Sequence, residues 1–371
     1  MARANASVLQ QGDPYHLNYS NESNVYYWTN RLTAYNAAIR IPALFRGVFG
    51  SGAVGQHARV RPVLAGQVAY SEPILQGLRY LESVWGQPST MLHALAGAPY
   101  FGAGTGNLST VPQLLQRVAE GVAALHPSAG WGRGGGLQQH ATLAAWYRTF
   151  FHGYEGGPDF SEGGQDYALS GAAQRDAGFT PIMTQYYLNW AAYGNAGPLN
   201  QFEAGASNWS MQFGCWGLVE RIADVSSPKL AAFDAARAAP RPANALGIPV
   251  PTAGFPAGFY AGCSAPNASA AGPLGMHASG PWLLYPVNLA GLAPGATLRV
   301  AIGDHYNGGS QMLEVGLNSA GLANISSSGV ATFVLTEADV GGDFGGLAAF
   351  GLRGSTPGAY YVIDNLTFTV A

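Results

Sequence analysis

Residues 92–100 read LHALAGAPY, and residues 111–125 read VPQLLQRVAEGVAAL. The first segment is a short, largely apolar run with Pro99 next to its end, which predicts a buried strand. The second has apolar residues at three- and four-residue steps, which predicts an amphipathic helix. A strand followed by a crossover helix is the repeating unit of a parallel sheet, so this stretch predicts an α/β fold.

The same alternation extends in both directions over about the first 235 residues. We expect five strands, at Tyr15–Asn21, Val60–Gln67, Leu92–Tyr100, Phe151–Gly156 and Leu199–Phe202. We expect helices at Val25–Phe45, Glu72–Trp85, Val111–Leu125, Leu137–Phe151, Asp176–Trp190 and Pro228–Ala238. The pattern corresponds to about five βα units.

The pattern changes after a Pro/Ala/Gly-rich stretch at residues 238–258, which we interpret as a linker. Short alternating segments follow, at Trp282–Leu289, Thr297–Gly303, Met312–Leu317, Val330–Thr336, Leu347–Leu352 and Tyr360–Val370. They are typical of an antiparallel β-sandwich. The predicted fold class is therefore α/β plus all-β, with an α/β domain over residues 1–237 and a β-sandwich over residues 259–371.

Composition excludes several classes of protein. Hydrophobic residues make up 48% of the chain, which is enough for a sizeable core. There are 17 basic and 20 acidic residues, and this balance excludes a nucleic-acid-binding protein driven by bulk charge. The sequence has no apolar run of membrane-spanning length, so we predict no transmembrane helix.

N-x-S/T sequons are frequent in this chain, and they begin at Asn5, Asn18, Asn21, Asn107, Asn208, Asn267, Asn324 and Asn365. Such sequons are acceptors for N-glycosylation, so their number favours a secreted or cell-surface glycoprotein. We predict glycans on Asn107, Asn208, Asn267, Asn324 and Asn365. The alternative is that loops rich in Asn and Ser generate sequons by chance. The first 20 residues contain no apolar segment typical of a signal peptide.

The two cysteines, Cys215 and Cys263, allow one disulfide or two buried free thiols, and the sequence leaves both open. No Cys/His spacing typical of a metal site is present. We predict neither a metal ion nor a cofactor.

Two glutamates lie at the carboxyl ends of predicted strands: Glu22 comes directly after one, and Glu155 lies in the last two residues of another. Active sites of (β/α)₈ barrels lie at the carboxyl ends of the strands. Two carboxyl groups facing each other there are what glycoside hydrolysis requires, one as acid and the other as nucleophile. The alternatives are that Glu22 caps a helix and that Glu155 is a surface turn residue.

Three motifs carry a family resemblance: YSNE at residues 19–22, HALAGAPYFG at 93–102 and YEGG at 154–157. Together they resemble the (β/α)₈-barrel clan of retaining glycoside hydrolases, at strands four, six and seven. The resemblance implies that Glu22 is the acid/base, that Asn21 binds the sugar 2-hydroxyl and that Glu155 is the nucleophile. It implies that Tyr100 hydrogen-bonds the nucleophile.

The resemblance spans about residues 10–235 and corresponds to strands four to eight, so the expected fold is a partial TIM-type barrel. We expect the first three strands to come from a longer product, from a homo-oligomer or from a second chain. Trp190 and Trp216 are expected to stack on sugar rings, with packing in the core as the alternative for each.

The first functional hypothesis is a secreted glycoside hydrolase-like protein that acts on a polysaccharide or glycan by double displacement. The second is a non-catalytic structural or cell-surface glycoprotein built on a degenerate hydrolase barrel. A third is a protein whose cleft binds carbohydrate without cutting it.

Overall fold

The structure of the protein is a computed structural model. It describes residues 43–55, 57–58, 61–66, 68, 72–123, 137–161, 164–194, 197–205, 208–243, 247–249, 274–277, 282–304, 312–326, 329–355 and 360–371. The chain forms two compact units, each built from separate segments. Unit 1 comprises the described residues within 1–96, 132–151 and 246–371, and unit 2 comprises those within 97–131 and 152–245. The predicted strands and sites before residue 43 lie outside the described residues.

A three-stranded sheet contains β1 (Val63–Ala65), β2 (Ala94–Gly97) and β4 (Phe150–Gly153), in the order β1-β2-β4. β1 pairs with β2 in parallel, and a parallel bridge joins Gly153 at the end of β4 to Leu199. The predicted parallel α/β arrangement is therefore confirmed. Within the described ranges these strands form an open sheet and no closed barrel.

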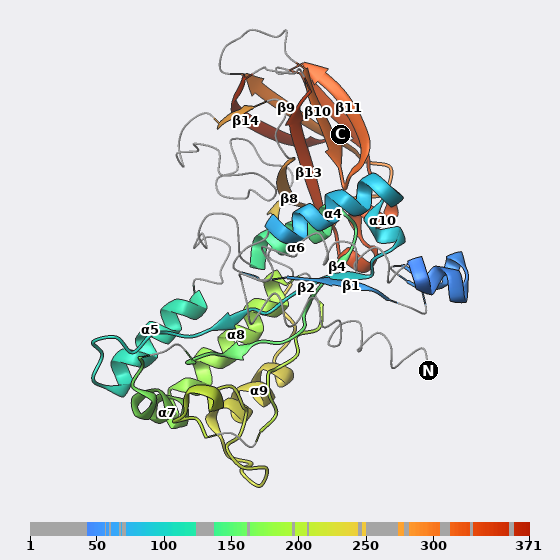
Figure 1. Ribbon diagram of the computed structural model, residues 1–371. Helices are drawn as coiled ribbons and strands as arrows, with labels where there is room; N and C mark the ends of the chain where they lie inside the picture. The colour runs from blue at the N-terminus through green and yellow to red at the C-terminus, as the bar shows by residue number, and fades with distance from the viewer. Residues whose placement is uncertain are drawn as a thin grey trace. The chain divides into compact units, whose positions relative to one another are not determined.

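Unit 1 contains the helices α4 (Glu72–Trp85) and α6 (Leu137–Trp146). α4 begins and ends where the sequence predicts. α6 is buried along most of its length and packs against the antiparallel strands β8 (Leu283–Asn288) and β13 (Leu347–Gly354) (Figure 1). This packing makes the helices and the antiparallel strands parts of one unit.

Unit 2 contains four helices that pack on one another (Figure 1): α5 (Val111–Ala123), α7 (Tyr167–Arg175), α8 (Phe179–Tyr193) and α9 (Pro228–Ala238). Their core is formed by apolar side chains such as Leu114, Val118 and Met183. The sequence predicts a helix over Asp176–Trp190. The structure instead has α7, whose N-cap is Asp166, and α8, which begins after Gly178.

Two mainly antiparallel sheets complete unit 1. One has the order β11-β10-β13-β8-β6, and the other has the order β12-β9-β14-β7. The remaining bounds are β6 (Ile248–Pro249), β7 (Leu274–His277), β9 (Thr297–Asp304), β10 (Met312–Leu317), β11 (Ala320–Ser326), β12 (Val330–Val334), α10 (Glu337–Val340) and β14 (Tyr360–Val370). Strands of both sheets contribute to one apolar core, which includes Tyr285, Val300, Val315 and Phe350.

No described helix combines the length and the apolar character needed to cross a membrane.

Candidate active site

Three extended segments of unit 2 lie side by side and form the framework of the candidate site. β3 (Tyr100–Phe101) pairs in parallel with β5 (Gly157–Pro158). On the other side, the amide of Asn200 donates to Gly153 O (2.9 Å), and the amide of Phe202 donates to Gly156 O (2.8 Å). Residues from three distant parts of the sequence therefore meet at one edge, as expected where parallel strands end.

Tyr100 and Glu155 are brought together by this framework. Both side chains are half-buried, and the hydroxyl of Tyr100 is hydrogen-bonded to the carboxylate of Glu155. Burial raises the pKa of Tyr100 well above its usual range, and the negative charge of Glu155 and the hydrogen bond raise it further. Tyr100 therefore stays protonated and is the donor. A donated hydrogen bond stabilises a carboxylate in its charged form.

The two glycines after Glu155 are required by close packing. Gly157 has a φ of 126°, and a Cβ there would lie 2.2 Å from Nε2 of Gln201. A Cβ on Gly156 would lie 2.5 Å from the hydroxyl of Tyr186. Side chains at either position would push residues 153–157 away from their neighbours. The Glu-Gly-Gly motif is thus explained by the backbone path that carries Glu155.

A row of aromatic rings begins at Tyr100. Phe202 lies 6.4 Å from Tyr100, and Trp216 lies 5.5 Å from Phe202, both edge to face. Phe213 is stacked on Trp216 at 6.4 Å, and it is 75% exposed. Aromatic rings with an exposed face offer a flat apolar surface of the kind on which the C–H face of a sugar ring can stack.

Trp216 is fixed at its polar edge by Asp159. The indole Nε1 of Trp216 donates to Oδ1 of Asp159 (3.2 Å), which also accepts the amide of Ser161 (2.9 Å). The amide of Asp159 donates in turn to Phe101 O, which ties this carboxylate to the β3 segment (2.7 Å). The ring of Trp216 is therefore oriented by the same framework that carries Tyr100.

The other predicted site residues are placed differently. Trp190 is only 5% exposed, and its Nε1 donates to Gly197 O (2.8 Å), so it lies in the interior of unit 2. Asn21 and Glu22 lie outside the described residues. Cys215 is a buried free thiol, and Cys263 lies outside the described residues.

The predicted glycosylation sites that the structure describes lie on loops and strands. Asn107 and Asn208 are exposed in loops of unit 2, and Asn324 is exposed on β11. Asn365 lies in β14, and Asn267 lies outside the described residues.

We expect Asn107, Asn208 and Asn324 to carry glycans in protein secreted from a eukaryotic host, because a transferase needs an accessible acceptor. Peptide-N-glycosidase treatment converts each modified Asn to Asp, and peptide mass spectrometry will locate the change. Unmodified Asn at all three sites, in a preparation whose control glycoprotein is fully modified, would contradict this prediction.

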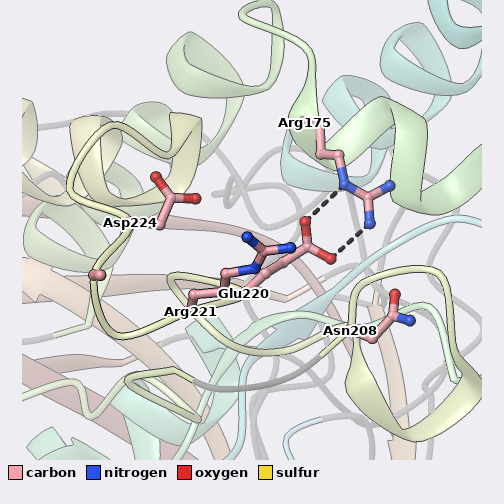
Figure 2. Close-up of a pocket in the computed structure, with 6 residues that line it drawn as sticks. Arg175, Asn208, Glu220, Arg221 and Asp224 are labelled. Carbon is pink, nitrogen blue, oxygen red and sulfur yellow. Dashed lines mark hydrogen bonds and ion pairs between the residues drawn. The ribbon is translucent and has the colours of Figure 1, made fainter.

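A polar groove of about 810 Å³ lies elsewhere in unit 2, lined by Arg175, Asn208, Glu220, Arg221, Ala223 and Asp224 (Figure 2). Arg175 and Glu220 face each other in a two-bond ion pair, with Nε to Oε2 at 2.7 Å and Nη2 to Oε1 at 2.6 Å. This pair raises the pKa of Arg175 and lowers that of Glu220. The two arginines and two acids balance in charge, so the groove favours neither anions nor cations.

Phe202 and Phe213 are absent from the set of site residues predicted from sequence. The available signal is the clustering of aromatic residues in QFE at 201–203 and MQFGCWGL at 211–218. Loops have no periodicity that would show which of these rings are exposed.

No cluster of three or more His, Cys, Asp or Glu side chains suited to a metal ion occurs in the described part of the chain.

Searches against protein-family models and against curated proteins gave no match. Solved structures with distant similarity include a xylanase from Cellvibrio japonicus in complex with xylopentaose, at 15% identity and a TM-score of 0.21. That match covers 32% of this chain and 27% of the xylanase. A xylan-binding module has 15% identity and a TM-score of 0.21, over 32% of this chain and 90% of the module.

A 4-O-methyl-α-glucuronidase with specificity for decorated arabinogalactans has 15% identity and a TM-score of 0.22, over 54% of this chain and 28% of that enzyme. This chain thus spans about a quarter of the two enzymes it is compared with. All three are carbohydrate-active or carbohydrate-binding proteins.

Proposed function

We propose that this chain carries the nucleophile side of a retaining glycoside hydrolase site, in which Glu155 attacks a sugar at its anomeric carbon. One observation carries the proposal: Tyr100 donates a hydrogen bond to Glu155 at the end of adjoining parallel segments, beside a row of aromatic rings. The hydrogen bond orients the carboxylate, and the rings provide a surface for the sugar.

The reaction follows from the chemistry of an oriented carboxylate. A carboxylate oxygen of Glu155 bonds to the anomeric carbon while the bond to the leaving oxygen breaks, and that oxygen takes a proton from an acid. Water then attacks the same carbon, gives its proton to the same group acting as base, and releases Glu155. The anomeric configuration is retained because two inversions occur.

Glu22 is the residue that we propose as acid/base, with Asn21 at the sugar 2-hydroxyl. Both assignments come from the YSNE motif at residues 19–22. In this proposal the parallel segments belong to a partial (β/α)₈ barrel, which a longer product, a second copy or another chain completes. The substrate is a polysaccharide or glycan outside the cell, because sequons are modified on proteins that enter the secretory pathway.

Covalent trapping tests the nucleophile before the natural substrate is known. The full-length protein is incubated with epoxide-bearing cyclitols of gluco, xylo and manno configuration. A carboxylate that serves as nucleophile opens the epoxide and forms an ester, while the epoxide oxygen takes a proton. We expect peptide mass spectrometry to find the ester on Glu155.

A matched control is available in Glu203, a half-buried carboxylate next to Phe202. Labelling should disappear in Glu155→Gln and persist in Glu203→Gln. Labelling of another residue in both the wild type and Glu155→Gln would overturn the proposal. If no probe labels Glu155, the proposal also fails, and the non-catalytic structural glycoprotein becomes the better description of this chain.

A further inference from the structure

Lys229 is the only lysine in the sequence, and it is fully buried. It lies in the first turn of α9, whose N-cap is Ser227. Burying an amine is costly unless its hydrogen bonds are made, so its surroundings must compensate for the lost water. Desolvation indeed lowers the pKa of Lys229 well below its usual range.

The partners of Lys229 are the two carbonyl groups on either side of Trp216. Its Nζ donates to Cys215 O (2.6 Å) and to Gly217 O (2.9 Å), and it lies 4.3 Å from the ring centroid of Trp209. The amino group is therefore enclosed by two carbonyl oxygens and one aromatic face, and its two donated hydrogen bonds compensate for part of the lost hydration.

The carbonyl group of Trp216 is also held by a side chain. Nε2 of Gln201 donates to Trp216 O (3.1 Å), and Nε1 of Trp209 adds a second bond to Gly217 O (3.0 Å). Three consecutive carbonyl groups thus accept hydrogen bonds from side chains of distant residues. A loop bound in this way has little freedom to change its path.

The start of α9 extends the same contact by one residue. The hydroxyl of Ser227 donates to Leu218 O (2.5 Å) and accepts the amide of Leu230 (3.0 Å). Ser227 and Lys229 together attach residues 215–218 to a helix end. The ring that these residues carry is Trp216, which is in contact with Phe202 and Phe213.

We propose that Lys229 is a positioning residue that fixes the Trp216 ring as a stacking surface for a sugar unit next to the one attacked by Glu155. This inference rests on the proposed function and adds a second sugar subsite, on Trp216 and Phe213, to it. A lysine suits the position because its compact amino group reaches both carbonyl groups, whereas the planar guanidinium of an arginine needs a wider space.

The test compares Lys229→Met with wild type by hydrogen exchange and by binding. Methionine keeps most of the side-chain length but donates no hydrogen bond. We expect the amides of residues 215–218 to exchange at least about tenfold faster in Lys229→Met, because the loop opens more readily. The control is Asn189→Ala, which removes a buried hydrogen bond to Val122 O (3.1 Å) far along α8. It should leave the exchange of residues 215–218 unchanged.

Binding separates the subsite from the nucleophile. Gluco-, xylo- and manno-oligosaccharides are titrated calorimetrically, and the single-ring epoxides report on Glu155 alone. Lys229→Met should raise the Kd of an oligosaccharide about tenfold. This change in binding free energy is about the size of the net contribution of one hydrogen bond. The rate of epoxide labelling should change less than twofold. Lys229→Arg should behave as Lys229→Met.

Unchanged exchange at residues 215–218 in Lys229→Met overturns the inference. Equal losses of oligosaccharide binding and epoxide labelling also overturn it, because they would mean a general loss of structure. A third outcome separates the two proposals. If exchange is faster in Lys229→Met and epoxides still label Glu155, but the wild type binds no oligosaccharide, the second subsite is excluded and the proposed function stands. If the epoxides label nothing either, the proposed function itself fails.

Discussion

Replacing Glu155 with glutamine is expected to abolish the turnover of any glycoside that this protein hydrolyses. The amide has the size of the carboxylate and can still accept a hydrogen bond from Tyr100, so the site keeps its shape. It cannot form the ester, so kcat should fall by about 10⁴-fold or more, as expected when a nucleophile is removed. The measurement is release of the aryl alcohol from aryl glycosides of the configuration that labels Glu155.

Chemical rescue makes this result specific to the nucleophile. In Glu155→Ala, azide can occupy the space of the missing carboxylate and attack the anomeric carbon of an activated aryl glycoside. The aryl alcohol leaves and a glycosyl azide of inverted configuration forms. Rescue by azide, with the product identified by NMR, would assign Glu155 as nucleophile. Full activity in Glu155→Gln would exclude that role.

Tyr100→Phe should give a smaller effect, and the difference distinguishes orientation from chemistry. Losing a hydrogen bond to a charged group costs about 1.5–3 kcal/mol, which corresponds to roughly a 10- to 160-fold lower kcat. The pKa of Tyr100 is raised above its usual value of 10.0, so Tyr100 stays protonated at pH 10. A loss of activity that occurs below pH 10 must therefore come from another group.

The second large effect is expected for Trp146→Ala, in unit 1. Trp146 is 1% exposed, and its ring lies 4.9 Å from that of Trp282. A Cβ on Gly351 would lie 2.5 Å from the Trp146 ring, so strand β13 contacts the indole directly. Truncation leaves a large cavity between α6 and the strands, and we expect a loss of about 3–5 kcal/mol of stability.

Urea unfolding followed by circular dichroism measures this loss, with the transition of unit 1 analysed separately. Val334→Ala is the control, because Val334 is 68% exposed and should change stability by less than about 0.5 kcal/mol. A cost below about 1 kcal/mol for Trp146→Ala would show that the helix and the sheet are not coupled through this ring.

Much of the fold could be predicted from local sequence, and the failures have identifiable causes. α9 was predicted with its observed bounds because Ser227 and Pro228 form a strong helix start. β11 was missed because its small residues alternate weakly. Its signal is the turn before it, where Asn318 and Ser319 both have a φ of 53°, as in a two-residue hairpin.

The candidate site could be predicted only where a motif marked it. Tyr100 and Glu155 both lie at the carboxyl ends of predicted strands, and the structure brings them into contact. Their roles in catalysis remain predictions. The positions of Phe213 and Lys229 relative to Trp216 depend on contacts between residues distant in sequence, which local patterns do not reveal. The sequence shows that Lys229 is the only lysine among 17 basic residues. Its positioning role can be inferred only from the structure, in which its buried Nζ donates to two carbonyl groups.

The way in which unit 1 is assembled has a consequence for limited proteolysis. Its C-terminal strands are joined to earlier segments by the Trp146–Trp282 contact, by Arg148 donating to Leu347 O (3.4 Å) and by Ser319 donating to Gln87 (3.0 Å). A nick between residues 238 and 258 would cut the chain without releasing a module. The two fragments would elute together in size-exclusion chromatography under native conditions and separate only in denaturant.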